Sequence, residues 1–374
     1  MKFSAIPGLG DVKSLLIEAA RSNHIAHAQL FVGAEGALNL PMAIAFATYL
    51  HCENKGETDS CGTCPACSKS NKFIHPDTHF VFPLRSIRAD EDRERIKAEM
   101  LKSWRAFLLE QPFADLNDWT SYYGGEDKPA LISREESRDI IKTLSLKPFE
   151  SQYKVMIIWQ PELMHSSAAN GILKILEEPA PYTFFFLVTN AADKLLPTII
   201  SRTQIITIPL LGDELLNEYL IQQHNMEATQ AARVTSLAEG NINFALKLVD
   251  SEEVTDAKQF TDWMRACYSK SYGSLVLMAD AFYGLDKLSR KNLLKYSMNA
   301  LRETLLHISG ADEMSRSQGN EFKLLKEFSK VMNTEKIEKS FTLMNDATYH
   351  LERNGSPKMI FLDLSLKLAR TINP

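Results

Sequence analysis

The clearest hydrophobic pattern lies near the middle of the chain, where short apolar runs alternate with a helical segment. The runs Val155–Ile158, Phe184–Val188 and Ile205–Ile208 have the length and composition of strands buried on both faces of a sheet. Between the first two runs, Ala168–Glu178 repeats apolar residues at helical spacing, and two prolines follow closely. Alternating strands and helices predict a parallel sheet, which presents ligand-binding residues at the carboxyl ends of its strands.

The N-terminal part predicts another strand followed by a glycine turn. His27–Val32 runs into Gly33, and Ala43–Leu50 follows as an apolar helix. This order is the context of a phosphate-binding P-loop, whose pattern GxxxxGK[ST] requires Gly, Lys and Ser or Thr at positions 38, 39 and 40. Those positions hold Leu38, Asn39 and Leu40. Because the lysine for the phosphates and the hydroxyl for Mg²⁺ are replaced, the sequence predicts the scaffold of a P-loop without its chemistry.

Four cysteines have the spacing of a metal site. They follow the pattern C-x8-C-x2-C-x2-C and are Cys52, Cys61, Cys64 and Cys67. Thiolates two residues apart can chelate one ion from a tight turn, and four of them close a tetrahedral, structural Zn²⁺ site. The alternatives are two disulfides or four unrelated thiols, and a cytosolic setting disfavours disulfides. His51 and His75 lie near enough in sequence to replace a cysteine, but we interpret them as packing residues, and Cys267 as a buried thiol.

Two other regions are predicted to be helical. Residues 79–130 contain a helix of mixed charge and an aromatic-rich loop, for which we favour a covering role over partner contact. From Leu211 onward the pattern is purely helical, with stripes such as Ile337, Phe341, Met344, Thr348 and Leu351. Such stripes are more often internal core than interface.

Composition and charge narrow the functional classes. The 374 residues are 45% hydrophobic, carry a net charge of −5 and have a pI of about 6.0. This balance argues against a protein that grips nucleic acid across a broad basic face. We expect no membrane segment, because no apolar run approaches about 18 residues. The N-terminal residues do not form a signal peptide, so we expect a cytoplasmic location.

The middle of the chain resembles a known family. NGILKILEEPAPYTFFFLVTN followed by LLPTIISRTQ is similar to the AAA+ subunits of bacterial DNA polymerase III clamp loaders, most closely those of the delta-prime type. The resemblance implies an α/β AAA+ domain over 1–208, with a zinc module at about 50–70 and an insertion at about 79–130. It also implies a small helical lid domain over 209–253 and an all-α collar domain over 254–374, through which subunits form a ring.

The resemblance also implies that further nucleotide-binding groups are missing. Active members place Asp and Glu directly after the Val155–Ile158 strand, where this chain has Trp159 and Gln160, with Glu162 displaced nearby. Active members often carry an arginine after the glycine at position 240, where this chain has Asn-Ile-Asn, and Asn243 is suited to cap a helix. Asn190, at the sensor position of the family, would be vestigial. We therefore expect no ATP on this chain.

Arg202 is the candidate for catalysis. The segment SRTQ resembles the Ser-Arg-Cys motif of clamp loaders, with Thr203 in place of the cysteine. An arginine at a subunit edge can act as an arginine finger on the ATP of a neighbouring subunit. The alternatives are an ion pair within the chain and an ordinary surface arginine. Like Asn190, Arg202 lies just outside an apolar run, so we expect both residues at the working edge of the sheet.

The resulting hypothesis is a non-hydrolysing subunit of a clamp loader. Its partners would be gamma/tau-like ATPase and delta-like subunits in a hetero-oligomeric ring. Through that ring it would serve the sliding clamp and primer–template DNA. One alternative is an active clamp-loader ATPase, which the residues at 39, 159 and 160 oppose. The other is a zinc-containing nucleic-acid-binding protein, which the acidic pI opposes.

Overall fold

The chain forms two compact units. The structure, a computed structural model, describes residues 1–87, 91–125, 129–144, 147–250, 254–285, 287–315, 319–353 and 355–373. Unit 1 comprises Met1–Asn225 and Glu239–Phe244, and unit 2 comprises Met226–Ala238 and Ala245–Pro374. Parts of the predicted insertion and the end of the predicted lid segment lie outside the described residues, and the three-part division of the chain stays a prediction.

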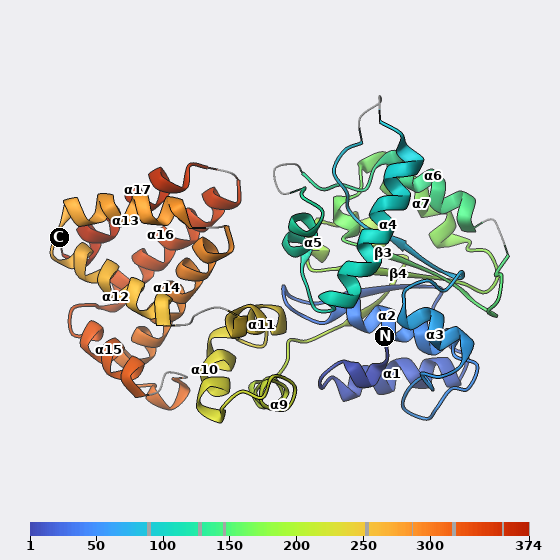
Figure 1. Ribbon diagram of the computed structural model, residues 1–374, viewed down its shortest axis with the longest axis horizontal. Helices are drawn as coiled ribbons and strands as arrows, with labels where there is room; N and C mark the ends of the chain where they lie inside the picture. The colour runs from blue at the N-terminus through green and yellow to red at the C-terminus, as the bar shows by residue number, and fades with distance from the viewer. Residues whose placement is uncertain are drawn as a thin grey trace. The chain divides into compact units, whose positions relative to one another are not determined.

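Unit 1 is built on a parallel sheet, of which β3 and β4 are labelled in Figure 1. The sheet has five strands in the order β2-β3-β4-β1-β5. The strands are β1 Ala28–Val32, β2 Thr78–Val81, β3 Lys154–Trp159, β4 Thr183–Thr189 and β5 Gln204–Thr207. All residues of β3 and β4 are buried, as expected for strands covered on both faces. The predicted parallel α/β sheet is confirmed.

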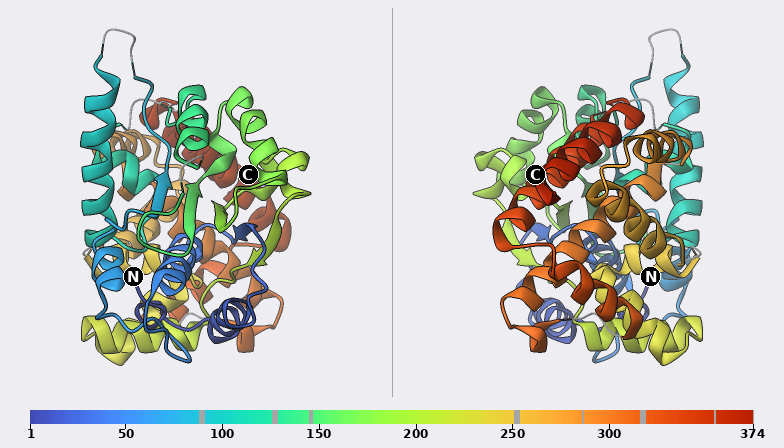
Figure 2. Two further views of the ribbon diagram at one scale, coloured as in Figure 1. Left: turned by 90° about the vertical axis from the view of Figure 1, so that its right-hand side faces the viewer. Right: turned by 90° about the vertical axis from the view of Figure 1, so that its left-hand side faces the viewer.

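Helices cover both faces of the sheet (Figure 2). The helices of unit 1 are α1 Gly10–Arg21, α2 Asn39–His51, α3 Pro65–Asn71, α4 Arg93–Glu110, α5 Leu116–Tyr122, α6 Arg134–Leu144, α7 Ser166–Glu177, α8 Pro197–Ile200 and α9 Asp213–His224. On one face, Phe46 of α2 stacks on Phe186 of β4 with ring centroids 5.3 Å apart. On the other face, α6, α7 and α8 pack against Leu30, Met156 and Leu187. Alternate residues of each strand thus point to opposite helix layers.

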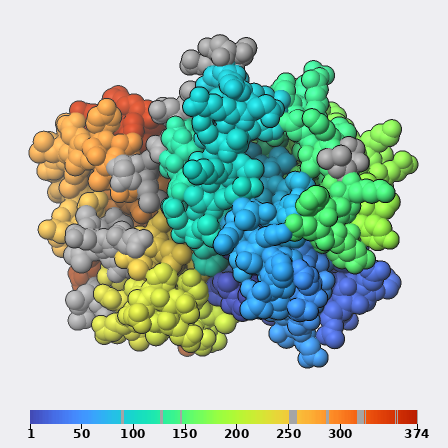
Figure 3. Space-filling model, turned by 45° about the vertical axis from the view of Figure 1, so that its right-hand side comes forward, coloured from blue at the N-terminus to red at the C-terminus, as the bar shows by residue number. Residues whose placement is uncertain are grey.

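The insertion is an ordered part of unit 1. Helices α4 and α5 bury two indole rings, those of Trp104 and Trp119, with no exposed surface. The ring of Trp104 stacks on Phe82, just beyond β2, at 4.4 Å between centroids and lies 5.0 Å from Trp159 at the end of β3. The outer side of α4 forms part of the molecular surface (cyan in Figure 3). The insertion therefore covers the sheet at the carboxyl end of β3.

Unit 2 is helical throughout its described residues. Its helices are α10 Ala228–Ala238, the end of α11 Ile242–Asp250, α12 Val254–Tyr268, α13 Tyr272–Gly284, α14 Lys287–Ile308, α15 Gly319–Ser329, α16 Thr334–Glu352 and α17 Pro357–Ile372. Buried residues of α12 to α17 form one apolar core, against which Leu237 of α10 packs, and the predicted all-helical C-terminal region is confirmed. The predicted stripe is wrong at Phe341, which is 40% exposed, because the buried face of α16 runs through Ser340 and Met344 instead. No described helix is both long and apolar enough to cross a bilayer.

Candidate functional site

The loop after β1 has its carbonyl groups engaged by side-chain amides. It runs from Gly33 to Leu38, and α2 begins at the next residue, Asn39. The Nδ2 of Asn190 donates to the carbonyl oxygens of Gly33 and Ala34 at 3.1 and 2.8 Å. The Oδ1 of Asn190 in turn accepts a hydrogen bond from Nε2 of Gln160 at 3.1 Å. Asn190 is thus a structural tie between β4 and the loop, a role that its sequence position alone did not indicate.

Asn39 occupies the P-loop lysine position and turns into the protein. Its Nδ2 donates to the carbonyl oxygen of Thr189 at 2.8 Å, and the residue is only 2% exposed. A Cβ atom at Gly33 would overlap its Oδ1, so this side chain sits tightly beneath the loop. Leu38 and Leu40 on either side are buried as well. The three substituted P-loop positions therefore form part of the packed core.

The two positions at which the resemblance implies Asp and Glu are the last residue of β3 and the residue after it, and both are buried as well. Trp159 is 3% exposed and lies against Trp104 of the insertion. Gln160 adopts a left-handed backbone with φ 56°, which aims its amide at Asn190. Burial raises the pKa of Glu162, the displaced carboxylate, which favours its neutral form over the ionised form that a metal ion requires.

Asn241 closes the loop from a distant segment. Gly36 has φ +87°, and a Cβ atom there would overlap the side-chain amide of Asn241. The Nδ2 of Asn241 approaches the carbonyl oxygen of Glu35 at 3.5 Å, while its Oδ1 accepts from the backbone N–H of Phe244 at 2.9 Å. Asn241 is thus the residue that caps α11, and the expectation for Asn243 is wrong, because the Asn243 side chain bonds to Asp118. No local sequence signal pairs residue 36 with residue 241.

The four predicted cysteines come together. Their sulfur atoms all lie within 4.8 Å of one another, and those of Cys61 and Cys67 are 3.9 Å apart. A tetrahedral site with Zn–S bonds of about 2.3 Å has S···S edges of about 3.8 Å, so the spacing fits a zinc ion. Backbone N–H groups of Cys61, Cys64 and Cys67 donate to the sulfurs of Cys52, Cys61 and Cys64 at 3.3 to 3.4 Å. Such bonds favour thiolates, and the one from Cys64 is the largest cause that lowers the pKa of Cys61 to about 6, whereas burial raises the pKa of Cys52 and of Cys67. The cluster could hold a metal ion.

The nearby histidines lie outside this group of sulfurs. The rings of His51 and His75 stack on each other with centroids 4.1 Å apart, and Nδ1 of His51 hydrogen-bonds to Oγ of Ser151 at 2.8 Å. Burial lowers the pKa of His51 to about 3 and also lowers that of His75. Both are neutral packing residues at physiological pH.

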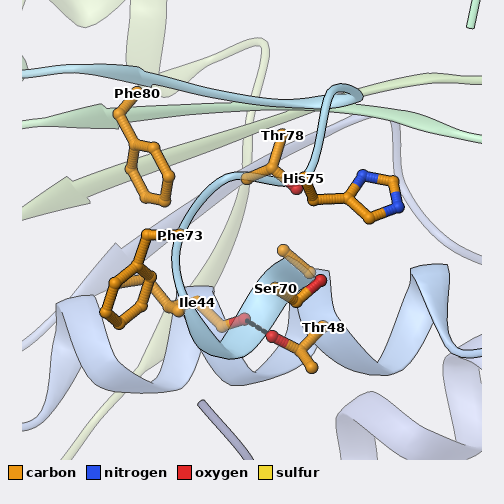
Figure 4. A pocket seen from close by; sticks show the side chains of 8 residues that line it. Ile44, Thr48, Ser70, Phe73, His75, Thr78 and Phe80 are labelled. Atoms are coloured by element: carbon orange, nitrogen blue, oxygen red, sulfur yellow. Dashed lines mark hydrogen bonds between the residues drawn. The ribbon is translucent and has the colours of Figure 1, made fainter. Parts of the chain in front are cut away.

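A small cavity beside the histidines is too small for a substrate. It lies between α2 and the segment leading to β2, and Ile44, Thr48, Ser70, Phe73 and Phe80 are among the residues that line it (Figure 4). Its volume of about 10 Å³ is at the lower limit for one water molecule. Ser70 Oγ, which has no hydrogen-bond partner among the described residues, gives such a water one polar neighbour.

Arg202 lies at the amino ends of the strands, whereas the Gly33–Leu38 loop lies at their carboxyl ends. Arg202 comes shortly before β5, separated from it by Thr203, whereas Gly33 follows β1, and these two strands are parallel neighbours. The expectation that Arg202 lies at the same end of the sheet as Asn190 is therefore wrong. In a parallel sheet, a residue that precedes one strand and a residue that follows another lie at opposite ends of the strands. Its Nε donates to Oε1 of Glu177 at 2.6 Å, its Nη2 contacts the same oxygen, and its Nη1 donates to the carbonyl oxygen of Thr198 at 2.9 Å. The side chain of Arg202 remains 31% exposed.

The strand order, with β1 between β4 and β5, and the glycine loop that leads into α2 are those of a parallel α/β domain with the scaffold of a P-loop. In this protein the side-chain amide of Asn190 donates hydrogen bonds to the loop, and Leu38 and Leu40 at its end are buried. A family model described as "DNA polymerase III, delta subunit" matches residues 9–211, more than half of the chain. The chain belongs to this family.

The chain is also similar to individual known proteins. The chain is 27% identical over 247 residues to DNA polymerase III subunit delta' of Bacillus subtilis, covering 66% of this chain and 61% of that protein. It is 23% identical over 266 residues to subunit tau/gamma of Haemophilus influenzae, covering 70% of this chain and 32% of that protein. Among solved structures, a gamma subunit-related protein of Thermotoga maritima is 15% identical with a TM-score of 0.42, covering 95% of this chain and 99% of that one. The chain thus spans less than two thirds of the curated relatives named here.

Proposed function

We propose that the protein is a non-hydrolysing, delta-prime-like subunit of a DNA polymerase III clamp loader. The observation that carries the proposal is the set of amide contacts at the loop, in which Asn39, Asn190 and Asn241 engage the groups around Gly33–Gly36. A P-loop needs its lysine and its backbone directed at phosphate, and here an amide at position 39 is directed at Thr189 instead. No ATP binds at this site.

The partners follow from the same proposal. The protein assembles with gamma/tau-like ATPase subunits and a delta-like subunit, and the ring they form loads the sliding clamp onto primer–template DNA. The C-terminal unit supplies contacts within the ring. The four cysteines hold one structural Zn²⁺, since a site closed by four sulfurs has no open position for catalysis.

Arg202 acts in this proposal as an arginine finger in trans. Support comes from its position, because an arginine at the amino end of β5 is at the end of the sheet opposite to its own loop, with its side chain partly exposed. Its partner Glu177 does not prevent this. The two side chains are 31% and 48% exposed, and an ion pair of that kind contributes about 0–1 kcal/mol. A phosphate group on a neighbouring subunit outcompetes such a weak pair, since guanidinium binds phosphate by two parallel hydrogen bonds.

Two measurements test the proposal. Titration of the isolated chain with Mg·ATP should give no saturable binding, and tight binding would reject the non-hydrolysing role. In the reconstituted complex, Arg202→Ala should lower ATP turnover severalfold while leaving assembly intact. Arg95→Ala is the matched control, because Arg95 also pairs with a glutamate, Glu99, but is 76% exposed on α4. Equal turnover by both variants would reject the finger.

A further inference from the structure

The insertion contacts two sets of elements that are far apart in sequence. On one side it is anchored to the α/β core by Trp104, which packs between Phe82 and Trp159. The indole N–H of Trp119 donates to the carbonyl oxygen of Pro83 at 2.8 Å. These contacts are fully buried, so α4 and α5 have a fixed place on the core.

A charged network fixes the other end of α4. Lys97 contacts both Glu136 and Asp139 of α6, at 3.0 and 2.5 Å. Arg93 reaches the same two carboxylates at 3.4 and 3.0 Å. Two cations that each meet the same two carboxylates favour one arrangement of α4 against α6. Partial burial lowers the pKa of Lys97, but the two carboxylates raise it further, so that it stays above its usual value. Helix α4 is therefore held at both ends.

The far side of the insertion reaches the helical segments of unit 1. Asn243, which is 8% exposed, donates through Nδ2 to Oδ2 of Asp118 in α5 at 2.8 Å. That carboxylate also accepts from the backbone N–H of Asp115, so it is held by the capping box of α5. Phe113, between α4 and α5, lies edge-on to Tyr219 of α9 with centroids 6.1 Å apart.

We propose that α4 and α5 form a brace that holds α9 and the segment 239–244 on the α/β core without any ligand. The same segment meets the core a second time, where Asn241 packs against Gly36. With two points of attachment made by residues of the chain itself, Asn243 and Asn241, the position of the segment no longer depends on what the loop binds. The brace is built from this chain's insertion and is independent of the role proposed for Arg202.

The test is hydrogen exchange on the full chain carrying Asn243→Asp or Phe113→Ala. The first change places a second carboxylate beside Asp118, and the second removes the ring that meets Tyr219. Loss of the part-buried hydrogen bond or of the aromatic contact should speed exchange about tenfold. We expect that acceleration in residues 239–244 for Asn243→Asp and in α9 for Phe113→Ala, with β1, β3 and β4 unchanged.

Matched controls are Asn170→Asp, at an exposed position of α7, and Phe341→Ala, at an exposed position of α16. Both should leave these segments unchanged. The brace is overturned if neither test variant changes exchange in its target segment. It is also overturned if both variants accelerate exchange across the whole sheet, because the insertion would then be an ordinary part of one cooperative core. Phe113→Ala introduces no charge, so it decides the question if Asn243→Asp does not fold.

Discussion

The contact between Gly36 and Asn241 provides a direct test of how the loop is closed. Gly36→Ala adds one methyl group at a residue with φ +87°, where a side chain is strained, and that methyl overlaps the amide of Asn241. The left-handed backbone costs about 1–2 kcal/mol and the overlap about 1–3 kcal/mol. The single substitution should therefore lower the free energy of unfolding of unit 1 by about 2–5 kcal/mol.

A double-mutant cycle separates the two costs. Asn241→Ala removes the overlapping amide and a helix cap, which by itself costs about 0.5–2 kcal/mol. In the Asn241→Ala background, Gly36→Ala should cost only the backbone strain, so the two substitutions should couple favourably by about 1–3 kcal/mol. Gly212→Ala is the control, because nothing lies within 4 Å of a Cβ there.

Urea and thermal unfolding followed by tryptophan fluorescence provide the measurement. Three of the four tryptophans, at 104, 119 and 159, belong to unit 1, so the signal reports mainly on that unit. Each kcal/mol should shift the melting temperature by about 2–4 °C for a unit of this size. Strictly additive effects of the two substitutions would refute the reasoning, since they would mean that Asn241 does not occupy the space above Gly36.

Four further predictions concern other parts of the chain. Purified protein should contain about one zinc per chain, and Cys64→Ser should lose it whereas Cys267→Ser should retain it; metal analysis that finds a folded, metal-free wild type contradicts the site. Arg202→Ala should change the free energy of unfolding by less than about 1 kcal/mol, because its pair with Glu177 is exposed, and a larger loss in urea unfolding would indicate a structural role. Glu177→Gln should leave folding equally unchanged, and a drop in melting temperature of more than a few degrees would show that the pair is not weak. Burial lowers the pKa of His79 to about 4, so as the pH falls below 6.5 the unfolded chain binds a proton at this residue before the folded chain does. Between pH 6.5 and 4 this difference should lower the free energy of unfolding by about 1.4 kcal/mol per pH unit. Unfolding measured across that range should be less acid-sensitive in His79→Gln than in His24→Gln.

The sequence by itself determined the elements and the chemistry they lack. Strands such as β3 and β4 carry apolar runs that neighbouring residues specify, so periodicity predicts them. The zinc-type spacing of the cysteines is equally local, because a tight turn brings nearby sulfurs together. The absence of lysine at position 39 is visible as soon as the residues are aligned with the P-loop pattern, and the absence of carboxylates at 159 and 160 follows from the resemblance to the family.

Only the tertiary structure decided where the replaced residues go and what they touch. Asn39 turns toward Thr189, Trp159 packs against Trp104, and Asn241 covers Gly36. These partners are separated by long stretches of chain, and a periodic pattern contains no information about which distant residues meet. The end of the sheet at which Arg202 lies also depended on the direction and order of the strands. In a parallel sheet, the residue before one strand and the residue after its neighbour are at opposite ends. Topology, through the pairing of β1 with β4 and β5, therefore determined what the side chains of this protein can reach.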